Sequence, residues 1–127
     1  MKYMHTGIDI VKVDRFKNVS GHFMQRVFTS AEQAHIQKKG RPETAAGLFA
    51  AKEAIAKALS TGIVFPLTHI EIRHTPQGKP YAILHGKAKS ILKSKMNHKR
   101  KGRVFHLAIS ISHSATDAIA VAILTGV

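Results

Sequence analysis

The segment from Glu43 to Ser60 constrains the fold more than any other part of this 127-residue sequence, because 11 of its 18 positions are apolar. The apolar positions are Ala45, Ala46, Leu48, Phe49, Ala50, Ala51, Ala54, Ile55, Ala56, Ala58 and Leu59. Their run predicts one long helix, and Gly62 stands in the usual place for a helix end. Such a helix has almost no polar face, so we expect it to be mostly buried.

Strand-like segments lie on both sides of this helix in the sequence. A run rich in β-branched residues predicts a strand over Tyr3–Val13. Two later pairs of runs predict hairpins with short turns: 69–73 with 80–84, and Val104–Ser112 with Asp117–Leu124. Antiparallel strands packed on a long, buried, Ala-rich helix predict an α+β fold.

Two shorter helices complete the expected elements. Thr29 and Glu32 have the spacing of a capping box, which predicts a helix running toward Gly40. A second, basic helix is expected over about Gly86–Met96, followed by a charged loop over 97–103 with no apolar period.

The last two predicted strands alternate large and small side chains. Ala118, Ala120 and Ala122 alternate with branched residues, and His106, Ala108, Ser110 and Ser112 alternate with larger apolar ones. We expect the small residues to form one face. That face allows close approach of the Ala-rich helix or of a neighbouring subunit.

Composition limits the class of protein and its partners. The length suits a single domain over residues 1–127, and the absence of cysteine excludes disulfides and thiolate metal sites. No signal-peptide core and no membrane-spanning run is present, so we expect a cytoplasmic protein. Lys and Arg total 20 against 7 Asp and Glu, a formal charge of +13 that predicts acidic partners.

Asp9 and Glu53 are acids with apolar neighbours, where an unpaired charge is costly. Two interpretations are open. In one, Glu53 pairs with Lys57 one helical turn away and Asp9 caps a local turn. In the other, the two carboxylates bind Mg²⁺, which commonly takes one or two carboxylates with water and phosphate oxygens, while Lys57 lies beside the phosphates.

His113 is expected in the turn between the last two strands, with Ser112 and Ser114 on either side. This polar cluster suits a phosphate or an adenine ring, and the alternative is an ordinary turn histidine. The segment 93–103 holds basic residues and no acid, which suits a docking patch or a solvated loop. It contains no aromatic residue for base stacking, which disfavours a nucleic-acid module.

Several motifs together resemble the holo-acyl-carrier-protein synthase family, the small trimeric type of 4′-phosphopantetheinyl transferase. In chain order they are G-I-D-I, F-T-S-A-E, A-A-G-L-F-A-A-K-E-A-I-A-K-A-L-S-T-G, Q-G-K-P-Y and S-I-S-H-S. The match covers nearly the whole chain. The long central block followed by S-H-S is the most specific part of it.

The resemblance implies a homotrimer with active sites at subunit interfaces. The enzyme would use Mg²⁺ to transfer 4′-phosphopantetheine from coenzyme A to a serine of an acidic acyl carrier protein, in support of fatty acid biosynthesis. It would release adenosine 3′,5′-bisphosphate. Nucleic acid is then not a partner.

The resemblance also implies roles for individual residues. Asp9 and Glu53 match metal ligands, Lys57 matches a lysine near the phosphates, and these three form the catalytic set. His113 matches a coenzyme A contact from the adjacent subunit. The expected coenzyme A contacts are Lys57, His113, Lys52 and Ser112, and the expected carrier-protein contacts are Arg15 and Arg26.

The chain departs from the family pattern at Leu48, where an arginine able to contact coenzyme A phosphate is common. Arg41 or Lys39 is the expected substitute. The proton acceptor is either Glu53 or a water beside Asp9. Two other functions remain as alternatives: a nucleic-acid-binding module, and a trimeric scaffold that binds carrier protein or coenzyme A without transfer.

Overall fold

The computed structural model describes residues 3–62, 64–96 and 104–126. The elements are β1 (Tyr3–Lys12), η1 (Val13–Phe16), α1 (Gly21–Val27), α2 (Ser30–Lys39), α3 (Pro42–Ala58), η2 (Leu67–His69), β2 (Ile70–His74), β3 (Pro80–Leu84), α4 (Gly86–Met96), β4 (Phe105–His113) and β5 (Asp117–Gly126). The α+β class with antiparallel strands is confirmed. Within the described ranges, no helix combines the length and apolar character that crossing a membrane requires.

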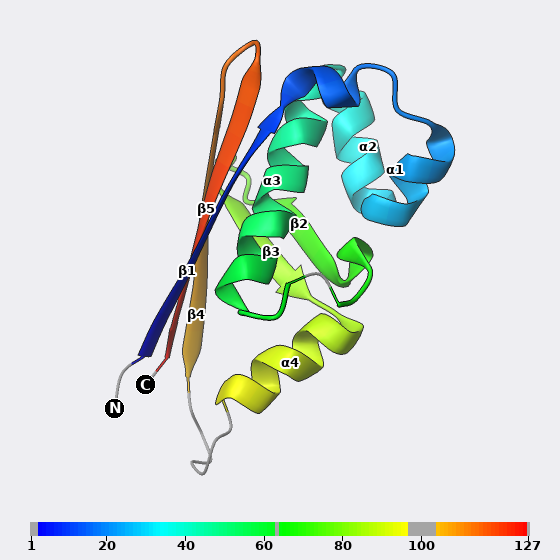
Figure 1. Ribbon diagram of the computed structural model, residues 1–127. Coiled ribbons are helices and arrows are strands. Elements are labelled where there is room, and N and C mark those ends of the chain that lie inside the picture. Colours follow the sequence, from blue (N-terminus) through cyan, green and yellow to red (C-terminus); the bar gives the residue numbers. More distant parts are fainter. Residues whose placement is uncertain (1–2, 63, 97–103, 127) are drawn as a thin grey trace.

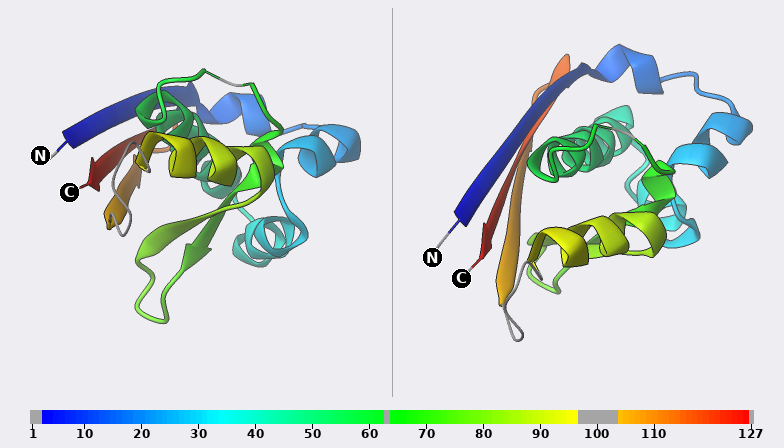
Figure 2. Two further views of the ribbon diagram at one scale, coloured as in Figure 1. Left: turned by 90° about the horizontal axis from the view of Figure 1, so that it is seen from below. Right: turned by 60° about the horizontal axis from the view of Figure 1, so that its bottom comes forward.

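The longest strands form a three-stranded sheet in the order β1-β5-β4, so both edges are strands far apart in sequence. Asp9 on β1 and Ile111 on β4 both lie opposite Ala120 of β5. All the helices lie on one side of this sheet (Figures 1 and 2). The hairpin β2–β3 is a separate two-stranded sheet, and β3 lies beside β4.

Helix α3 packs against the sheet at very short range, chiefly against β1 and β5. A Cβ at Gly7 would lie 1.8 Å from the carbonyl oxygen of Ala54 and 2.8 Å from the backbone nitrogen of Ala58. Only glycine permits this approach. At the other end of the helix, a Cβ at Gly47 would lie 2.9 Å from Cγ2 of Ile111 on β4. The helix therefore crosses from one edge of the sheet to the other.

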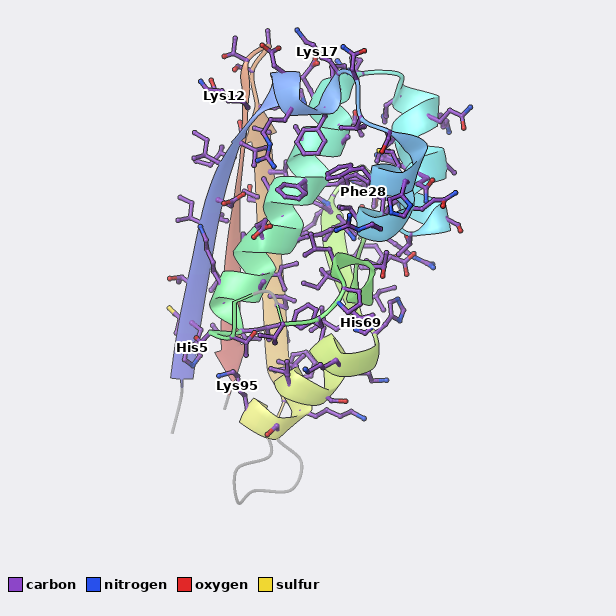
Figure 3. The ribbon with its side chains drawn as sticks, turned by 45° about the vertical axis from the view of Figure 1, so that its right-hand side comes forward. His5, Lys12, Lys17, Phe28, His69 and Lys95 are labelled. Carbon is purple, nitrogen blue, oxygen red and sulfur yellow. The ribbon has the colours of Figure 1, made fainter. Side chains whose placement is uncertain are left out.

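The opposite side of α3 is covered by α1, α2 and β2. Phe28, which follows α1, is 1 % exposed and lies in the layer between the α1 and α3 ribbons (Figure 3). The predicted capping box is present: Thr29 Oγ1 accepts from the Glu32 N–H at 3.2 Å, and Glu32 Oε1 accepts from the Thr29 N–H at 2.8 Å. Helix α2 ends at Gly40, which has a φ of 68°.

The predicted all-small face of the last two strands is wrong. Residues directly opposite each other in an antiparallel pair share a face, and the register places Ala122 opposite Ile109 and Ala108 opposite Ile123. Each face therefore mixes small residues from one strand with large residues from the other. The alanines of β5 face α3 and are buried, whereas Ala108 is exposed on the far side.

Other differences are local. The sequence analysis did not predict η1 or the short helix α1. The sequence feature that marks the start of α1 is Ser20, an N-cap residue whose side chain accepts a hydrogen bond from the Phe23 N–H. His113 is the last residue of β4 and not part of the turn. Of the basic segment 93–103, the part from 97 onward lies outside the described residues.

Candidate active site

The structure brings Asp9, Glu53 and Lys57 together at the β1 edge of the sheet. Asp9 alternates with Gly7 and Val11 on the side of β1 that faces α3. Glu53 and Lys57 immediately precede the helix residues that contact Gly7. In Figure 3, His5 and Lys12 mark the two ends of β1, and Asp9 lies between them. The close helix–strand approach at Gly7 thus places the three side chains near one another.

Lys57 forms its ion pair with Asp9 and not with Glu53. Its Nζ lies 3.3 Å from Asp9 Oδ1 and donates to the carbonyl oxygen of Ile8 at 2.6 Å. The helical spacing of Glu53 and Lys57 allows an ion pair, but the lysine reaches across to β1 instead. The simple helical pair considered from the sequence is therefore not the arrangement found.

The two carboxyl groups form an acidic site whose negative charge is only partly compensated. Burial raises the pKa of Glu53, the negative charge of Asp9 raises it further, and Lys57 and Arg15 partly oppose this shift. Asp9 Oδ2 is buried and has no hydrogen-bond partner. Buried polar atoms in native proteins are normally paired, so this oxygen is free to accept a further ligand.

These donors fit a hard divalent cation. Carboxylate oxygens are the ligands that Mg²⁺ prefers, and one or two of them suffice when water and phosphate fill the other positions. Within residues 3–62, 64–96 and 104–126, no group of three or more His, Cys, Asp or Glu side chains is arranged to hold a metal. The residues that would hold such a cation are Asp9 and Glu53.

Lys52 lies in a different environment from its neighbour Glu53. Its side chain is fully buried, pairs with Glu32 Oε1 at 2.7 Å, and donates to the carbonyl oxygens of Leu67 and Ile70. Burial lowers its pKa, and Glu32 opposes that shift. All three donor positions of the ammonium group have protein acceptors. The structure thus gives Lys52 a role in the core and does not bring it to the coenzyme A site expected from the sequence.

A basic pocket of about 500 Å³ lies at the opposite, β4 edge of the sheet. His113, which the resemblance implies as a coenzyme A contact from the adjacent subunit, lines this pocket. Leu48 also lines it beside Arg41 and Lys39, the two residues expected to replace the usual arginine. The cationic and imidazole side chains around the pocket are His35, Lys38, Lys39, Arg41, His74 and His113.

The sequence analysis missed His35, Lys38 and His74 as pocket residues. The rings of His35 and His74 stack with centroids 4.3 Å apart and an angle of 14° between their planes. Burial lowers the pKa of each, and nearby charges, including Lys39 in both cases, lower it further. A basic end of α2 was visible in the sequence, but its meeting with the β2–β3 turn depends on the tertiary fold.

Ser112 and His113 lie on opposite faces of β4 because side chains alternate along a strand. Ser112 is opposite Ile119, which is exposed on the sheet face away from α3. His113 is opposite Ala118, which is buried on the α3 side. Within one chain, Ser112 is therefore not in the pocket that His113 lines.

The two arginines expected to meet a carrier protein lie on neighbouring elements. The Arg15 guanidinium carbon is 5.4 Å from the ring centroid of Phe49 and 5.9 Å from that of Phe16. Arg15 is also close enough to lower the pKa of Glu53. Arg26 is exposed in the last turn of α1. Arg15 thus adjoins the acidic site, and Arg26 lies on a separate exposed helix.

The acidic site and the basic pocket occupy the two edges of one sheet, with β5 between them. A family model matches residues 5–115, and its family is the 4′-phosphopantetheinyl transferase superfamily. The chain belongs to the 4′-phosphopantetheinyl transferase superfamily. The family resemblance found in the sequence is confirmed.

Relatives in this superfamily match over nearly their whole length. A holo-[acyl-carrier-protein] synthase of Caldicellulosiruptor bescii is 46 % identical over 120 residues, which cover 92 % of this chain and 93 % of the relative. The solved structure of a Chronobacterium ammoniagenes ACPS–CoA complex has a TM-score of 0.81 at 28 % identity, with 96 % of each chain covered.

A holo-(acyl-carrier-protein) synthase from Bacillus anthracis, solved in complex with CoA (3′,5′-ADP), has a TM-score of 0.73 at 32 % identity, with 95 % of each chain covered. Two structures of this superfamily with the same fold were thus solved with coenzyme A or a part of it. The β1–β5–β4 sheet and the helices over it are the superfamily's architecture in this chain as well.

Proposed function

We propose that this protein transfers 4′-phosphopantetheine from coenzyme A to a serine of apo acyl carrier protein, as a holo-[acyl-carrier-protein] synthase that supports fatty acid biosynthesis. The observation that carries the proposal is the Asp9–Glu53 site with Lys57 beside it, in a chain 46 % identical to a named holo-[acyl-carrier-protein] synthase. The proposal assigns the activity to one domain over residues 1–127, acting in the cytoplasm.

The reaction exchanges one phosphorus–oxygen bond for another. The carrier serine oxygen forms a bond to the β-phosphorus of coenzyme A, the bond to the bridging oxygen breaks, and adenosine 3′,5′-bisphosphate leaves. The serine proton goes to Glu53 or to a water beside Asp9. The protein forms no covalent intermediate in this reaction, so most of the rate enhancement comes from positioning the two substrates and from electrostatic stabilisation.

In this proposal Asp9 and Glu53 hold Mg²⁺, and the bound cation would offset negative charge on the pyrophosphate. The unpaired Asp9 Oδ2 supports the assignment. Lys57 has an exposed amino group next to the same carboxylate, so it is placed to contact a phosphate that binds there. The phosphates would thus meet the amino group of Lys57 and the cation that Asp9 and Glu53 would hold.

The basic pocket at the β4 edge is the proposed site for the nucleotide end of coenzyme A. Arg41 and Lys39 give it positive charge suited to a phosphate, His113 adds a hydrogen-bonding imidazole, and Leu48 supplies an apolar wall. Arg15 and Arg26 are proposed to meet the acidic carrier protein, whose approach the formal charge of +13 favours.

We further propose a homotrimer with active sites between subunits. The sheet face away from α3 is apolar along β1 and β5 and uncovered, with Ile8 at 57 % and Ile10 at 64 % exposure. An apolar face of this kind is typical of a protein interface. Because the acidic site and the basic pocket lie at opposite edges, a head-to-tail ring would join the β1 edge of one subunit to the β4 edge of the next.

The test is intact-mass spectrometry of an apo acyl carrier protein incubated with this protein, coenzyme A and Mg²⁺, beside a chelator control. The expected result is a mass gain of one phosphopantetheine group that the chelator abolishes. Carrier that gains no mass, while the protein still binds coenzyme A or carrier, would identify a binding scaffold and contradict the proposal. Transfer that persists with chelator would remove only the metal assignment.

A further inference from the structure

Lys57 and a divalent cation would compete for the same carboxylate, that of Asp9. Its ammonium nitrogen is 3.3 Å from Asp9 Oδ1, and the other oxygen of the same carboxylate is buried and unpaired. Glu53 forms no ion pair among the described residues and lies close enough to Asp9 to be affected by its charge. Lys57 therefore offsets only part of the negative charge of the two carboxylates, and the charge of Arg15 also acts on Glu53.

The contact between Lys57 and Asp9 is easily opened. The lysine side chain is 53 % exposed, whereas that of Asp9 is 18 % exposed. An ion pair with so much solvent on one side is weak, and the lysine can exchange partners at small cost. Its other acceptor is a backbone carbonyl, that of Ile8, which water can satisfy equally well after the lysine leaves.

We propose that Lys57 is a resident counter-ion of Asp9, which weakens divalent-cation binding in the free protein and couples cation binding to the arrival of a phosphate substrate. The inference rests on the proposed function. Two positive charges at one carboxylate repel each other, so the lysine lowers the affinity of the site for a cation. A bound phosphate gives the lysine a new partner and removes that repulsion.

The coupling is reciprocal because binding free energies are linked. If coenzyme A increases cation affinity by some factor, the cation increases coenzyme A affinity by the same factor. Lys57 then makes each ligand depend on the other, so that the free protein holds little cation until substrate is present. Attraction between the cation and the phosphates couples the two ligands even without the lysine, so the contribution of Lys57 is the part of the coupling that its uncharged variants lose.

The measurement is Mn²⁺ affinity of the full chain, followed by the electron paramagnetic resonance of free Mn²⁺, with and without coenzyme A. Lys57→Met is expected to bind Mn²⁺ about tenfold more tightly than the wild type without coenzyme A. It should also show a smaller gain in Mn²⁺ affinity when coenzyme A is added. Lys57→Gln is a second uncharged variant, and Lys57→Arg should behave like the wild type.

Lys12→Met is the matched control, because Lys12 also forms an exposed ion pair with an aspartate, Asp117, at 3.0 Å. It should leave Mn²⁺ affinity nearly unchanged. Unchanged or weaker Mn²⁺ binding in Lys57→Met would overturn the inference. An equal increase of Mn²⁺ affinity in Lys12→Met would also overturn it. A wild type that binds no Mn²⁺ even when coenzyme A is present would overturn it too, whereas the mass-gain assay on carrier protein separately decides the transferase function.

Discussion

At the scale of single residues, the acidic site depends on a glycine two positions before its first carboxylate. The space at Gly7 lets α3 lie against β1, and this proximity places Glu53 and Lys57 beside Asp9. The motif G-I-D-I therefore has two functions in the site. The glycine allows the short distance between helix and strand, and the aspartate is the carboxylate that this short distance brings next to Glu53 and Lys57.

Gly7→Ala should severely destabilise the protein. The added Cβ would lie 1.8 Å from the carbonyl oxygen of Ala54, and both atoms belong to regular elements that cannot yield locally. We expect a loss of about 3 kcal/mol or more in the free energy of unfolding, measured by urea denaturation.

The matched control is Gly21→Ala, at the first residue of α1. No other group lies within 4 Å of a Cβ built there. Its free energy of unfolding should be unchanged or higher by up to about 1 kcal/mol, because alanine reduces the entropy of the unfolded chain. Equal effects from the two substitutions would contradict the close approach of α3 to β1.

At the scale of elements, the buried pair Lys52–Glu32 ties α3 to α2 and β2. Lys52 donates to Glu32 and to two backbone carbonyls, and Glu32 Oε2 also accepts from the Ile72 N–H at 2.7 Å. This network fixes α3 against rotation about its axis. Its consequence for the site is that Glu53, the next residue along, faces the edge of β1.

Lys52→Met should cost about 3–5 kcal/mol of unfolding free energy, because it leaves the Glu32 carboxylate buried without its partner. The second substitution Glu32→Gln, made in the same chain, should restore part of that loss by removing the unpaired charge. Denaturant unfolding of the single and double variants measures both effects.

Lys57→Met provides the comparison within the same helix. Its ion pair is exposed, so we expect a change of about 0–1 kcal/mol in unfolding free energy. A Lys52 variant as stable as the Lys57 variant would show that the buried pair does not hold α3 in place.

At the scale of the whole molecule, one subunit contains both halves of the proposed site but holds them apart. The carboxylates lie at the β1 edge and the basic pocket at the β4 edge, on either side of β5. A ring of subunits would bring the β1 edge of each copy to the β4 edge of another. Each complete site would then draw its residues from two chains.

Mixed oligomers test this arrangement by complementation. Glu53→Ala removes a residue of the acidic site, and the double variant Arg41→Ala/His113→Ala alters the basic pocket. Each variant alone should lose most transfer activity. Co-expressed subunits should recover a substantial fraction of it, because some interfaces join an intact acidic edge to an intact basic edge.

Recovery is measured as phosphopantetheine transfer, with native mass spectrometry to establish that mixed trimers form. Mixed trimers without any recovered transfer would contradict sites shared between subunits. Oligomers of a size other than three, or a protein that stays monomeric, would contradict the homotrimer itself.

The amino-acid sequence by itself determined the features that depend on local pattern. The capping box of α2, the Ala-rich helix, the two hairpins and the α+β class all follow from spacing and periodicity over a few residues. The superfamily also follows from the sequence, because its motifs are short and occur in a fixed order. Asp9, Glu53 and Lys57 are visible as charges in apolar surroundings.

Only the tertiary structure decided how those residues pair. Lys57 has an acid one helical turn away yet pairs with Asp9, and Lys52 lies in the core while its neighbour Glu53 faces the site. The faces of the last two strands depended on register, which alternation within one strand does not specify. These outcomes depend on contacts between elements far apart in the chain, and a local pattern carries no information about them.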